Sequence, residues 1–365
     1  MDLFQQMVEM GHERVVFCSN PDVGLEAIIA VHSTVLGPGL GGVRIWPYSS
    51  TEEAFVDVLR LSRGMTYKAA AAGLNLGGGK AVIIGDSKKV KSEVLLRAFG
   101  RYVESLGGLY ITAEDVGTDM EDMEVIQHET RWVTGVSPLL GGGGDPSPVT
   151  AFGVLQGMKA AVHRQFGDDS LQGRTVAIQG LGSVGYYLAK FLSEEGAKIF
   201  GADIDAEATA RASQELGVEI VPTGEILEVE CDVLAPCALG AILNDKTIPK
   251  LRCKIVAGGA NNQLAEERHG QELHGRGILY APDFVGNAGG LINVYNELVG
   301  YNRETAMRLA RGIYANMLRV FDISRTQAIP THVAAERLAE ERISQVKSLG
   351  SQNWVRTVRR RSAEP

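Results

Sequence analysis

Long apolar runs, paired cysteines and an excess of basic residues are all missing from this sequence of 365 residues. No segment reaches the roughly 18 uninterrupted apolar residues of a membrane-spanning helix, and the start lacks the basic head and apolar run of a secretion signal. The 36 Lys and Arg residues are outnumbered by 44 Asp and Glu, so the net charge is −8. A field of this sign repels nucleic acid. We therefore expect a cytoplasmic protein with neither a membrane nor a nucleic acid as partner.

Cysteine and histidine are also sparse. The four cysteines form no CxxC pair, and their number is far below that of a disulfide framework, which favours reduced thiols. The seven histidines form no HExxH pattern or other pair at helical ligand spacing, so no metal site is expected.

Length and patterning indicate two α/β domains. A chain of this length exceeds the usual size of one core, and 45% of its residues are hydrophobic. Apolar runs alternate with helical patterns over the first ~135 residues and again from residue 152 onward, where short turns indicate a parallel sheet covered by helices. Residues 137–150, SPLLGGGGDPSPVT, break both patterns, and we place the boundary there, although an ordinary surface loop remains an alternative. The predicted domains are residues 1–140 and 141–330.

A glycine-rich turn in the second domain predicts a Rossmann-type dinucleotide site. The strand candidate TVAIQG (175–180) runs directly into GLGSVG (180–185) and a helix, which is the context in which a GxGxxG pattern is specific. The predicted cofactor residues are Gly180, Leu181, Gly182, Ser183, Val184 and Gly185. Asp203 ends the next strand, where its carboxylate can accept ribose hydroxyls, and the following residues 204–206 include no cation for a 2′-phosphate. NAD is therefore expected rather than NADP.

Two lysines in the first domain are candidates for chemistry. Lys68 lies within a helical pattern, and Lys80 follows Gly77–Gly79, where a ligand could lie against bare backbone. Two ammonium groups in one partly dry site disfavour each other's charge, so one of them could act as a base near neutral pH. Asp115, at the end of a strand candidate, could exchange protons with it.

These residues lie within motifs that resemble the Glu/Leu/Phe/Val amino-acid dehydrogenase family over nearly the whole chain. The matching segments are LGPGLGGVR (36–44), RGMTYKAAAAGLNLGGGKAVIIGD (63–86), ITAEDVGT (111–118), PSPVTAFGV (146–154), QGLGSVG (179–185), CDVLAPCALGAILN (231–244), GGANNQL (258–264) and YAPDFVGNAGGLINV (280–294). The resemblance implies NAD-dependent oxidative deamination of an amino acid to a 2-oxo acid and ammonia.

The resemblance also implies roles for individual residues. Lys68 would bind the substrate α-carboxylate, Lys80 would be the general base that activates water, and Asp115 would take part in proton transfer. Asn262 would touch both substrate and nicotinamide. The weaker assignments on the nicotinamide side are Thr150, Cys237 and Ala238.

The same family implies the wider organisation of the molecule. The first domain would carry substrate binding, catalysis and oligomerisation, and a C-terminal helix (331–365) would pack back on it. The second domain would bind NAD, and a cleft would separate the two. Family members commonly assemble as octamers or dimers, so a homo-oligomer is expected.

The substrate side chain is predicted from residues that the resemblance assigns to its pocket. These are Leu40, Gly41, Ala113, Leu291 and Val294. None offers a charge to a glutamate side chain, and Ala113 favours a branched-chain amino acid. Because one methylene discriminates by only about 1–3 kcal/mol in an apolar pocket, phenylalanine or tryptophan remains an alternative. A catalytically silent NAD-binding protein is the alternative of another class.

Overall fold

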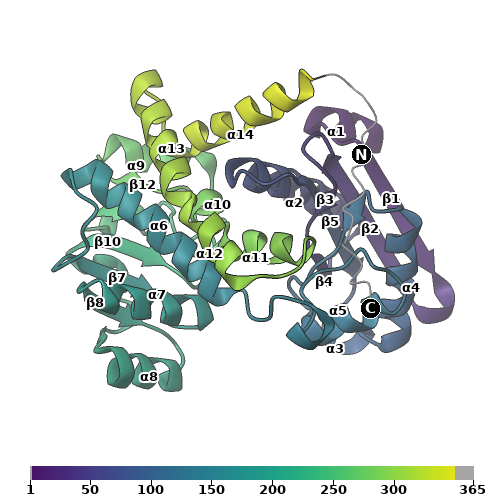
Figure 1. Cartoon of the computed structure of the whole chain (residues 1–365), viewed down its shortest axis with the longest axis horizontal. Coiled ribbons are helices and arrows are strands. Elements are labelled where there is room, and N and C mark those ends of the chain that lie inside the picture. The colour runs from purple at the N-terminus through teal and green to yellow at the C-terminus, as the bar shows by residue number, and fades with distance from the viewer. Residues whose placement is uncertain (1, 350–365) are drawn as a thin grey trace. The chain divides into compact units, whose positions relative to one another are not determined.

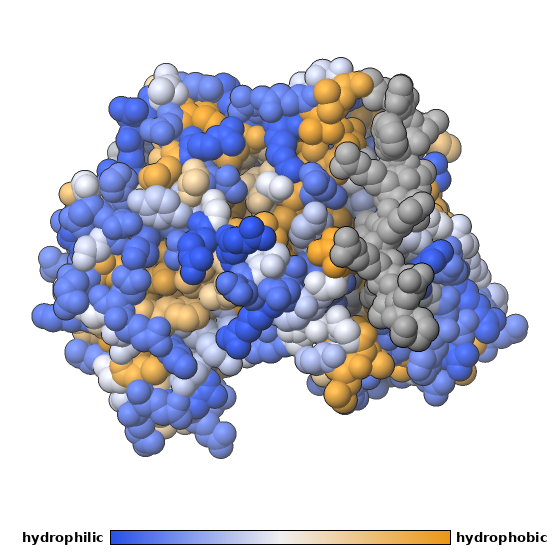
Figure 2. All heavy atoms as spheres, viewed as in Figure 1, coloured by the Kyte–Doolittle hydropathy of each residue, from blue (hydrophilic) through white to orange (hydrophobic). Residues whose placement is uncertain are grey.

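The structure is a computed structural model that describes residues 2–349. Within this range no helix is long and apolar enough to cross a membrane. The described chain folds into two compact units. Unit 1 comprises residues 2–144, 294–302 and 339–349, and unit 2 comprises residues 145–293 and 303–338. Figure 2 shows that hydrophilic residues predominate on the face it presents, with scattered apolar groups between them.

Unit 1 is built on a mixed sheet. Its strands are β1 (Arg14–Asn20), β2 (Leu25–Ser33), β3 (Gly39–Leu40), β4 (Val43–Trp46), β5 (Gly77–Ile84) and β6 (Tyr110–Ile111). Its helices, apart from two that also enter unit 2, are α1 (Leu3–Met10), α2 (Thr51–Ala71), α3 (Ser87–Val90), α4 (Glu93–Ser105) and α5 (Met120–Gln127). The strand order is β1-β2-β5-β3-β6, and β4 also pairs with β5. The β1–β2 and β2–β5 pairings are antiparallel, whereas β3 and β4 pair with β5, and β6 pairs with β3, in parallel.

Helices cover both faces of this sheet (Figure 1). Ile28 of β2 and Val82 of β5 pack with α2 in one apolar cluster. Ala81 and Ile83 of β5 pack with α4 and α5 in another. Because side chains alternate along a strand, residues 78 and 80 of β5 share the face of Val82, toward α2. Lys80 therefore points to the layer that also carries Lys68.

Glycines allow β5 to approach its neighbours closely. A Cβ at Gly77 would lie 1.8 Å from Ser33 O, and one at Gly78 would lie 2.2 Å from Ser62 O on α2. A Cβ at Gly79 would lie 2.5 Å from the Tyr110 ring. Protein atoms thus fill the space that we expected a ligand to use beside these three glycines. That expectation is wrong, because the three glycines lie inside a strand, where atoms of β2, α2 and Tyr110 pack directly against them.

Unit 2 is built on a parallel sheet. Its strands are β7 (Thr175–Gln179), β8 (Lys198–Ala202), β9 (Glu219–Ile220), β10 (Cys231–Pro236), β11 (Cys253–Val256) and β12 (Leu279–Tyr280). Its helices include α6 (Ser147–Phe166), α7 (Ser183–Glu194), α8 (Ala206–Leu216), α9 (Glu267–Gly275), α10 (Asp283–Gly286), α12 (Arg303–Arg311) and α13 (Ile313–Gln327). The strand order is β12-β11-β10-β7-β8-β9, and every pairing is parallel.

This order defines the second fold. Numbered along unit 2, the strands run 3-2-1-4-5-6 from one edge, which is the arrangement of the Rossmann fold. The sheet also buries one face against an apolar cluster that includes Ala177 of β7, Leu234 of β10 and Val256 of β11. The predicted α/β architecture with a Rossmann-type second domain is confirmed.

Two helices cross the division between the units. These are α11 (Gly289–Glu297), which joins unit 1 from Val294 onward, and α14 (Thr331–Lys347), which joins it from Ala339 onward. The buried carboxylate of Glu297 accepts the backbone N–H of Gly135 at 2.8 Å and of Gly143 at 2.9 Å, which explains why the second half of α11 groups with unit 1. The part of the predicted C-terminal helix beyond residue 349 lies outside the described residues.

Gly78→Ala is expected to separate α2 from β5, because the added Cβ would also lie 2.2 Å from Thr66 Oγ1 and 2.3 Å from Thr66 N. Overpacking of this kind destabilises by about 1–3 kcal/mol. Thermal unfolding followed by circular dichroism measures it. Gly64→Ala in the same helix is the matched control, since a Cβ there meets no described atom within 4 Å. Equal melting temperatures for the two variants would contradict this account of the glycines.

Candidate active site

A chain of charged side chains that are buried or half-buried occupies the α2 face of unit 1. Lys80 Nζ lies 3.0 Å from Asp115 Oδ2, and the Lys80 side chain is 8% exposed. Arg44 Nε donates to the same Asp115 oxygen at 3.0 Å. Arg44 Nη1 donates to Asp57 Oδ2 at 3.1 Å. The predicted pair of Lys80 and Asp115 is thus in direct contact, and it is joined by two residues that we did not single out from the sequence.

Burial and charge act on this pair in opposite directions. Burial lowers the pKa of the Lys80 ammonium, and the attraction of Asp115 offsets part of that effect. Burial also works to raise the pKa of Asp115, but the charges and hydrogen bonds of Lys80 and Arg44 outweigh it and bring the pKa below its ordinary value. Asp115 is therefore a carboxylate at neutral pH, beside an amine that releases its proton more easily than an exposed lysine. Burial, rather than a neighbouring ammonium, is the largest cause of the lowered pKa of Lys80.

Two consecutive glycines allow Lys80 and Asp115 to meet. The segment after β3 passes between β5 and residues 113–115, with Ala81 N donating to Gly42 O and Val43 N donating to Ala113 O. A Cβ at Gly41 would lie 1.9 Å from Gly79 O, and one at Gly42 would lie 2.3 Å from Glu114 O. Any side chain at either position would push β5 away from the Asp115 segment.

The loop that carries Asp115 is fixed by Thr118. Asp115 N donates to Thr118 Oγ1 at 2.9 Å, and Thr118 N donates back to Asp115 O at 3.0 Å. Thr118 Oγ1 also donates to Val43 O. Asp119 then caps α5 through a capping box with Asp122, which stabilises the helix N-terminus where the loop ends. Asp115 is held by local hydrogen bonds as well as by its ion pairs.

Lys68 lies half-buried in the last turn of α2. That part of the helix is anchored from two directions. His32 Nδ1 on β2 lies 2.8 Å from Thr66 Oγ1. From the second half of α14, Arg342 donates to the C-terminal carbonyls of α2, including Ala70 O at 3.2 Å, and to Leu74 O at 2.7 Å. A cation at a helix C-terminus stabilises the helix, so this contact supports the turn that presents Lys68.

The predicted substrate residues are divided between the units. In unit 1, Leu40 and Ala113 are 1% and 7% exposed, and Val294 of α11 is half-buried. In unit 2, Leu291 of the same helix is 5% exposed. The side-chain space of Gly41 is filled by backbone, as described above, so it offers only main-chain atoms.

In unit 2, the glycine-rich turn between β7 and α7 combines a positive backbone angle, a close backbone approach and an open position. Gly180 has φ +95°, in the region that favours glycine, and a Cβ at Gly185 would lie 1.9 Å from Gly180 O. A Cβ at Gly182 meets no described atom within 4 Å. Gly182 is the N-cap of α7, and no side chain accepts a hydrogen bond from the first N–H groups of that helix. A phosphate group is the partner that such a helix start prefers. Leu181 and Val184 complete the turn, with Ser183 opening the helix.

Asp203 lies beside this turn. Its Oδ2 accepts the N–H of Leu181 at 2.6 Å and its Oδ1 accepts that of Asp205 at 2.9 Å. Each carboxylate oxygen has a second lone pair, which leaves capacity for ribose hydroxyls. Asp205 caps α8 and is exposed, so a second negative charge stands close to the site.

The remaining predicted residues lie on loops of unit 2 and at the start of α6. Cys237 follows β10, and burial raises the pKa of its thiol to about 11, which makes it a poor nucleophile at neutral pH. Ala238 is exposed, and so is Asn262, whose φ of +51° is uncommon for a residue other than glycine. Thr150 lies in the first turn of α6 rather than in a loop, and its Oγ1 donates to Pro146 O.

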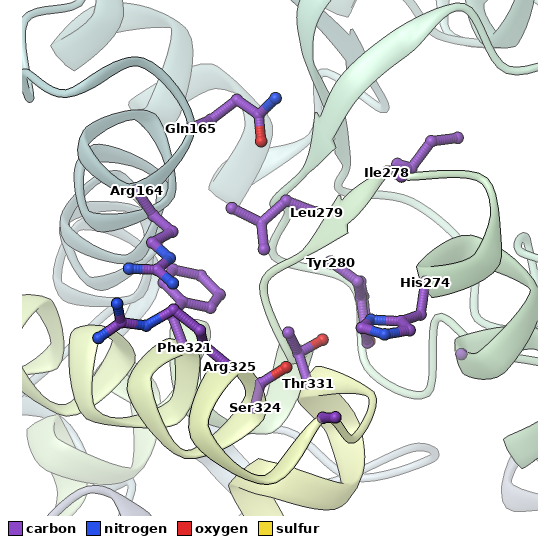
Figure 3. A pocket seen from close by; sticks show the side chains of 13 residues that line it. Arg164, Gln165, His274, Ile278, Leu279, Tyr280, Phe321, Ser324, Arg325 and Thr331 are labelled. Carbon is purple, nitrogen blue, oxygen red and sulfur yellow. The ribbon is translucent and has the colours of Figure 1, made fainter.

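Other candidate sites were considered in unit 2. A cavity of about 420 Å³ is bounded by α6, α9, β12, α13 and the start of α14, and its lining includes Arg164, His274 and Arg325 (Figure 3). Both arginines lie within 4.0 Å of Asp322, and the lining residues are different from those predicted for the site. Asp245, Glu266 and His269 bring possible metal ligands within 4.8 Å of one another. Arg268 already pairs with both of these carboxylates, so we assign no metal there.

Comparison with known proteins identifies the class. A family model for the Glu/Leu/Phe/Val dehydrogenase dimerisation domain matches residues 12–132. A model for Glutamate/Leucine/Phenylalanine/Valine dehydrogenase matches residues 141–207 and 203–349. The chain therefore belongs to the Glu/Leu/Phe/Val dehydrogenase family and is an amino-acid dehydrogenase. The resemblance inferred from the motifs is confirmed.

Three proteins of known activity are similar to this chain over nearly its full length. The chain is 58% identical over 351 residues to a leucine dehydrogenase of Thermoactinomyces intermedius, covering 96% of each chain. It is 56% identical over 366 residues to one of Geobacillus stearothermophilus, covering 100% of each chain. The crystal structure of L-tryptophan dehydrogenase from Nostoc punctiforme matches with a TM-score of 0.85 and 47% identity, covering 94% of this chain and 99% of that chain.

The two glycines of the turn should respond differently to alanine. Gly185→Ala places a Cβ against Gly180 O and should destabilise unit 2 by about 1–3 kcal/mol. Gly182→Ala should leave the melting temperature unchanged but weaken NADH binding at least about tenfold, because the methyl occupies the space left for a phosphate. Fluorescence titration with NADH and thermal unfolding measure both. Wild-type NADH affinity in Gly182→Ala would show that the cofactor does not approach this backbone.

Proposed function

We propose that this dehydrogenase catalyses the reversible, NAD-dependent oxidative deamination of branched-chain L-amino acids, leucine first and also valine and isoleucine, to 2-oxo acids and ammonia. The observation that carries the proposal is the buried contact between Lys80 and Asp115, with a lowered pKa for the lysine. The higher identity to two leucine dehydrogenases than to the tryptophan enzyme supports the choice of substrate.

NAD is the proposed cofactor. The open space at Gly182 and the uncapped start of α7 fit a dinucleotide phosphate. Asp203 would hold the adenosine ribose, and the acidic Asp205 disfavours the extra phosphate of NADP. Thr150, with Cys237, Ala238 and Asn262, would lie on the nicotinamide side. When bound, NAD accepts the hydride that leaves the substrate Cα.

The protein's own groups supply the remaining chemistry. Lys68 would anchor the substrate α-carboxylate by charge. Lys80, in its neutral form, would take a proton from the water that attacks the substrate iminium carbon, and collapse of the adduct releases ammonia. Asp115 touches Lys80 Nζ and is placed to exchange that proton. Fixed charges of this kind need no reorganisation as charge develops on the substrate.

The apolar character of the proposed pocket residues supports a branched aliphatic side chain. Leu40 and Ala113 are buried in unit 1 and Leu291 in unit 2, and Val294 adds a further β-branched side chain. None of these residues can pair with a side-chain carboxylate, which disfavours glutamate as substrate. Ala113 is the smallest of them and leaves room beside the reacting carbon.

We further propose a cytoplasmic homo-oligomer, a dimer or an octamer, with residues 1–140 as the substrate and oligomerisation domain and residues 141–330 as the NAD domain. The match to a dimerisation domain supports association through unit 1. Strand β1 stands at one end of the strand order and exposes Phe17 by 51%, which also favours association.

An aromatic amino acid is the second candidate substrate, because the tryptophan dehydrogenase of known structure has the same fold over nearly the full chain. Steady-state kcat/KM for leucine, valine, phenylalanine and tryptophan with NAD separates the two. We expect leucine to exceed both aromatic substrates by at least about tenfold, the discrimination of an apolar pocket. A higher kcat/KM for phenylalanine or tryptophan would overturn the branched-chain assignment.

Lys80→Ala distinguishes an enzyme from a silent NAD-binding protein. We expect kcat with leucine to fall at least about 100-fold, the usual contribution of a general base, while NADH binding stays at the wild-type value. Formation of NADH is followed by its absorbance. Lys89→Ala is the matched control, since Lys89 is 79% exposed and pairs only on the surface with Asp86. Full activity of Lys80→Ala would exclude Lys80 as the base.

A further inference from the structure

We propose that Arg44 is a positioning residue for this reaction: held by Asp57 of α2, it fixes the Asp115 carboxylate against Lys80 and sets the electrostatic balance of that pair. The inference rests on the proposed function, since it assigns a role within the same site. Arg44 follows the glycine pair 41–42 in the chain and lies on β4, next to β5 in the sheet.

The sheet geometry gives Arg44 this position. Val43 and Ile45 of β4 pack with α4 and α5, so the alternation of side chains directs Arg44 to the α2 face, the same face as Lys80. There it lies between one carboxylate that follows β6 and one on α2. Both Arg44 and Asp115 have side chains that are 21% exposed, so the ion pair is largely shielded from water.

The fork of the guanidinium group explains why an arginine stands here. Nε donates to Asp115 Oδ2 at 3.0 Å, while Nη1 donates to Asp57 Oδ2 at 3.1 Å. A lysine has one nitrogen and lacks this fixed spacing of donors. Asp57 is itself held, because Tyr48 Oη donates to its Oδ2 at 2.7 Å and Arg60 Nη2 donates to its Oδ1 at 2.8 Å. Asp57, the anchor of Arg44, therefore has two further hydrogen-bond partners.

The charge of Arg44 also acts on both members of the pair. Burial works to raise the pKa of Asp115, and Arg44 is among the groups that lower it instead. Burial lowers the pKa of Lys80, and Arg44 lowers it further by like-charge repulsion. Without Arg44, both pKa values should rise. A base with a raised pKa reaches its neutral form only at higher pH, so the activity should move in that direction.

The outer side of Arg44 opens to a surface cavity of about 620 Å³, which is also lined by Trp46, Tyr48 and Val56. Removal of the side chain would leave a gap that a small cation can enter from solvent. Each carboxylate would still keep a partner, since Asp115 retains Lys80 and Asp57 retains Tyr48 and Arg60. The fold should therefore tolerate the change.

The test compares Arg44→Ala, Arg44→Gln and Arg44→Lys with the wild type. We expect the ascending limb of the pH profile of kcat/KM for leucine to shift to higher pH by about 1 unit in the alanine and glutamine variants. The Arg44→Lys variant restores the positive charge, so its ascending limb should lie between that of the alanine variant and that of the wild type. Millimolar guanidinium should raise the activity of Arg44→Ala but not that of the wild type, whereas urea, a neutral molecule of the same shape, should not.

Arg60→Ala is the matched control. It removes a cation from the same Asp57 without touching Asp115 or Lys80, and the limb should stay in place. An unchanged limb in Arg44→Ala and Arg44→Gln, whatever the fall in kcat, would overturn the proposal by reducing Arg44 to a structural ion pair. Should the alanine variant fail to fold, Arg44→Gln alone decides the question. Absence of leucine turnover in the wild type would instead refute the proposed function.

Discussion

The buried ion pair of Lys80 and Asp115 is the interaction on which the proposed chemistry depends. An amine out of contact with water loses much of its hydration, and only a nearby carboxylate keeps its charged form accessible. The structure supplies that carboxylate from the loop between β6 and α5 and pairs it with Arg44 as well. The result is an amine whose pKa depends on the charges beside it, Asp115 and Arg44.

Backbone packing makes this arrangement possible. Gly41 and Gly42 leave no side chain between β5 and the segment that carries Asp115, and Gly78 lets α2 lie directly on the same strand. The electrostatic contact and the close packing therefore both depend on glycines, at residues 41–42 and at residue 78 of β5. In unit 2 the same residue type has a different use, because Gly182 faces open space rather than another chain segment.

Patterns formed by neighbouring residues in the sequence predicted much of the fold. Strand and helix alternation indicated both α/β units, and the glycine turn with its downstream acidic residue indicated a Rossmann fold, because these signals are carried by neighbouring residues. The Arg44–Asp57 link could not be found in this way, since it depends on which face of β4 meets α2. The glycines before Lys80 were misinterpreted, because a glycine run has the same composition in a loop as in a tightly packed strand. Helix α6 begins at Ser147, inside the segment 137–150 that we expected to break both patterns, because proline is favoured in a first helical turn and Pro148 stands there.

The three glycines of β5 have a consequence for the thermodynamics of the chain. Glycine gives the unfolded state more conformational freedom than any other residue. Each glycine in a strand interior therefore lowers the free energy of unfolding by about 0.5–1 kcal/mol relative to alanine. Replacing glycine by alanine is a common way to recover this entropy. Alanine cannot replace glycine without a steric clash at residues 77–79, because neighbouring atoms occupy the position of the added methyl group. Efforts to make a more heat-resistant variant should therefore begin at helical glycines with free surroundings, such as Gly64, and leave the strand that holds the reactive amine untouched.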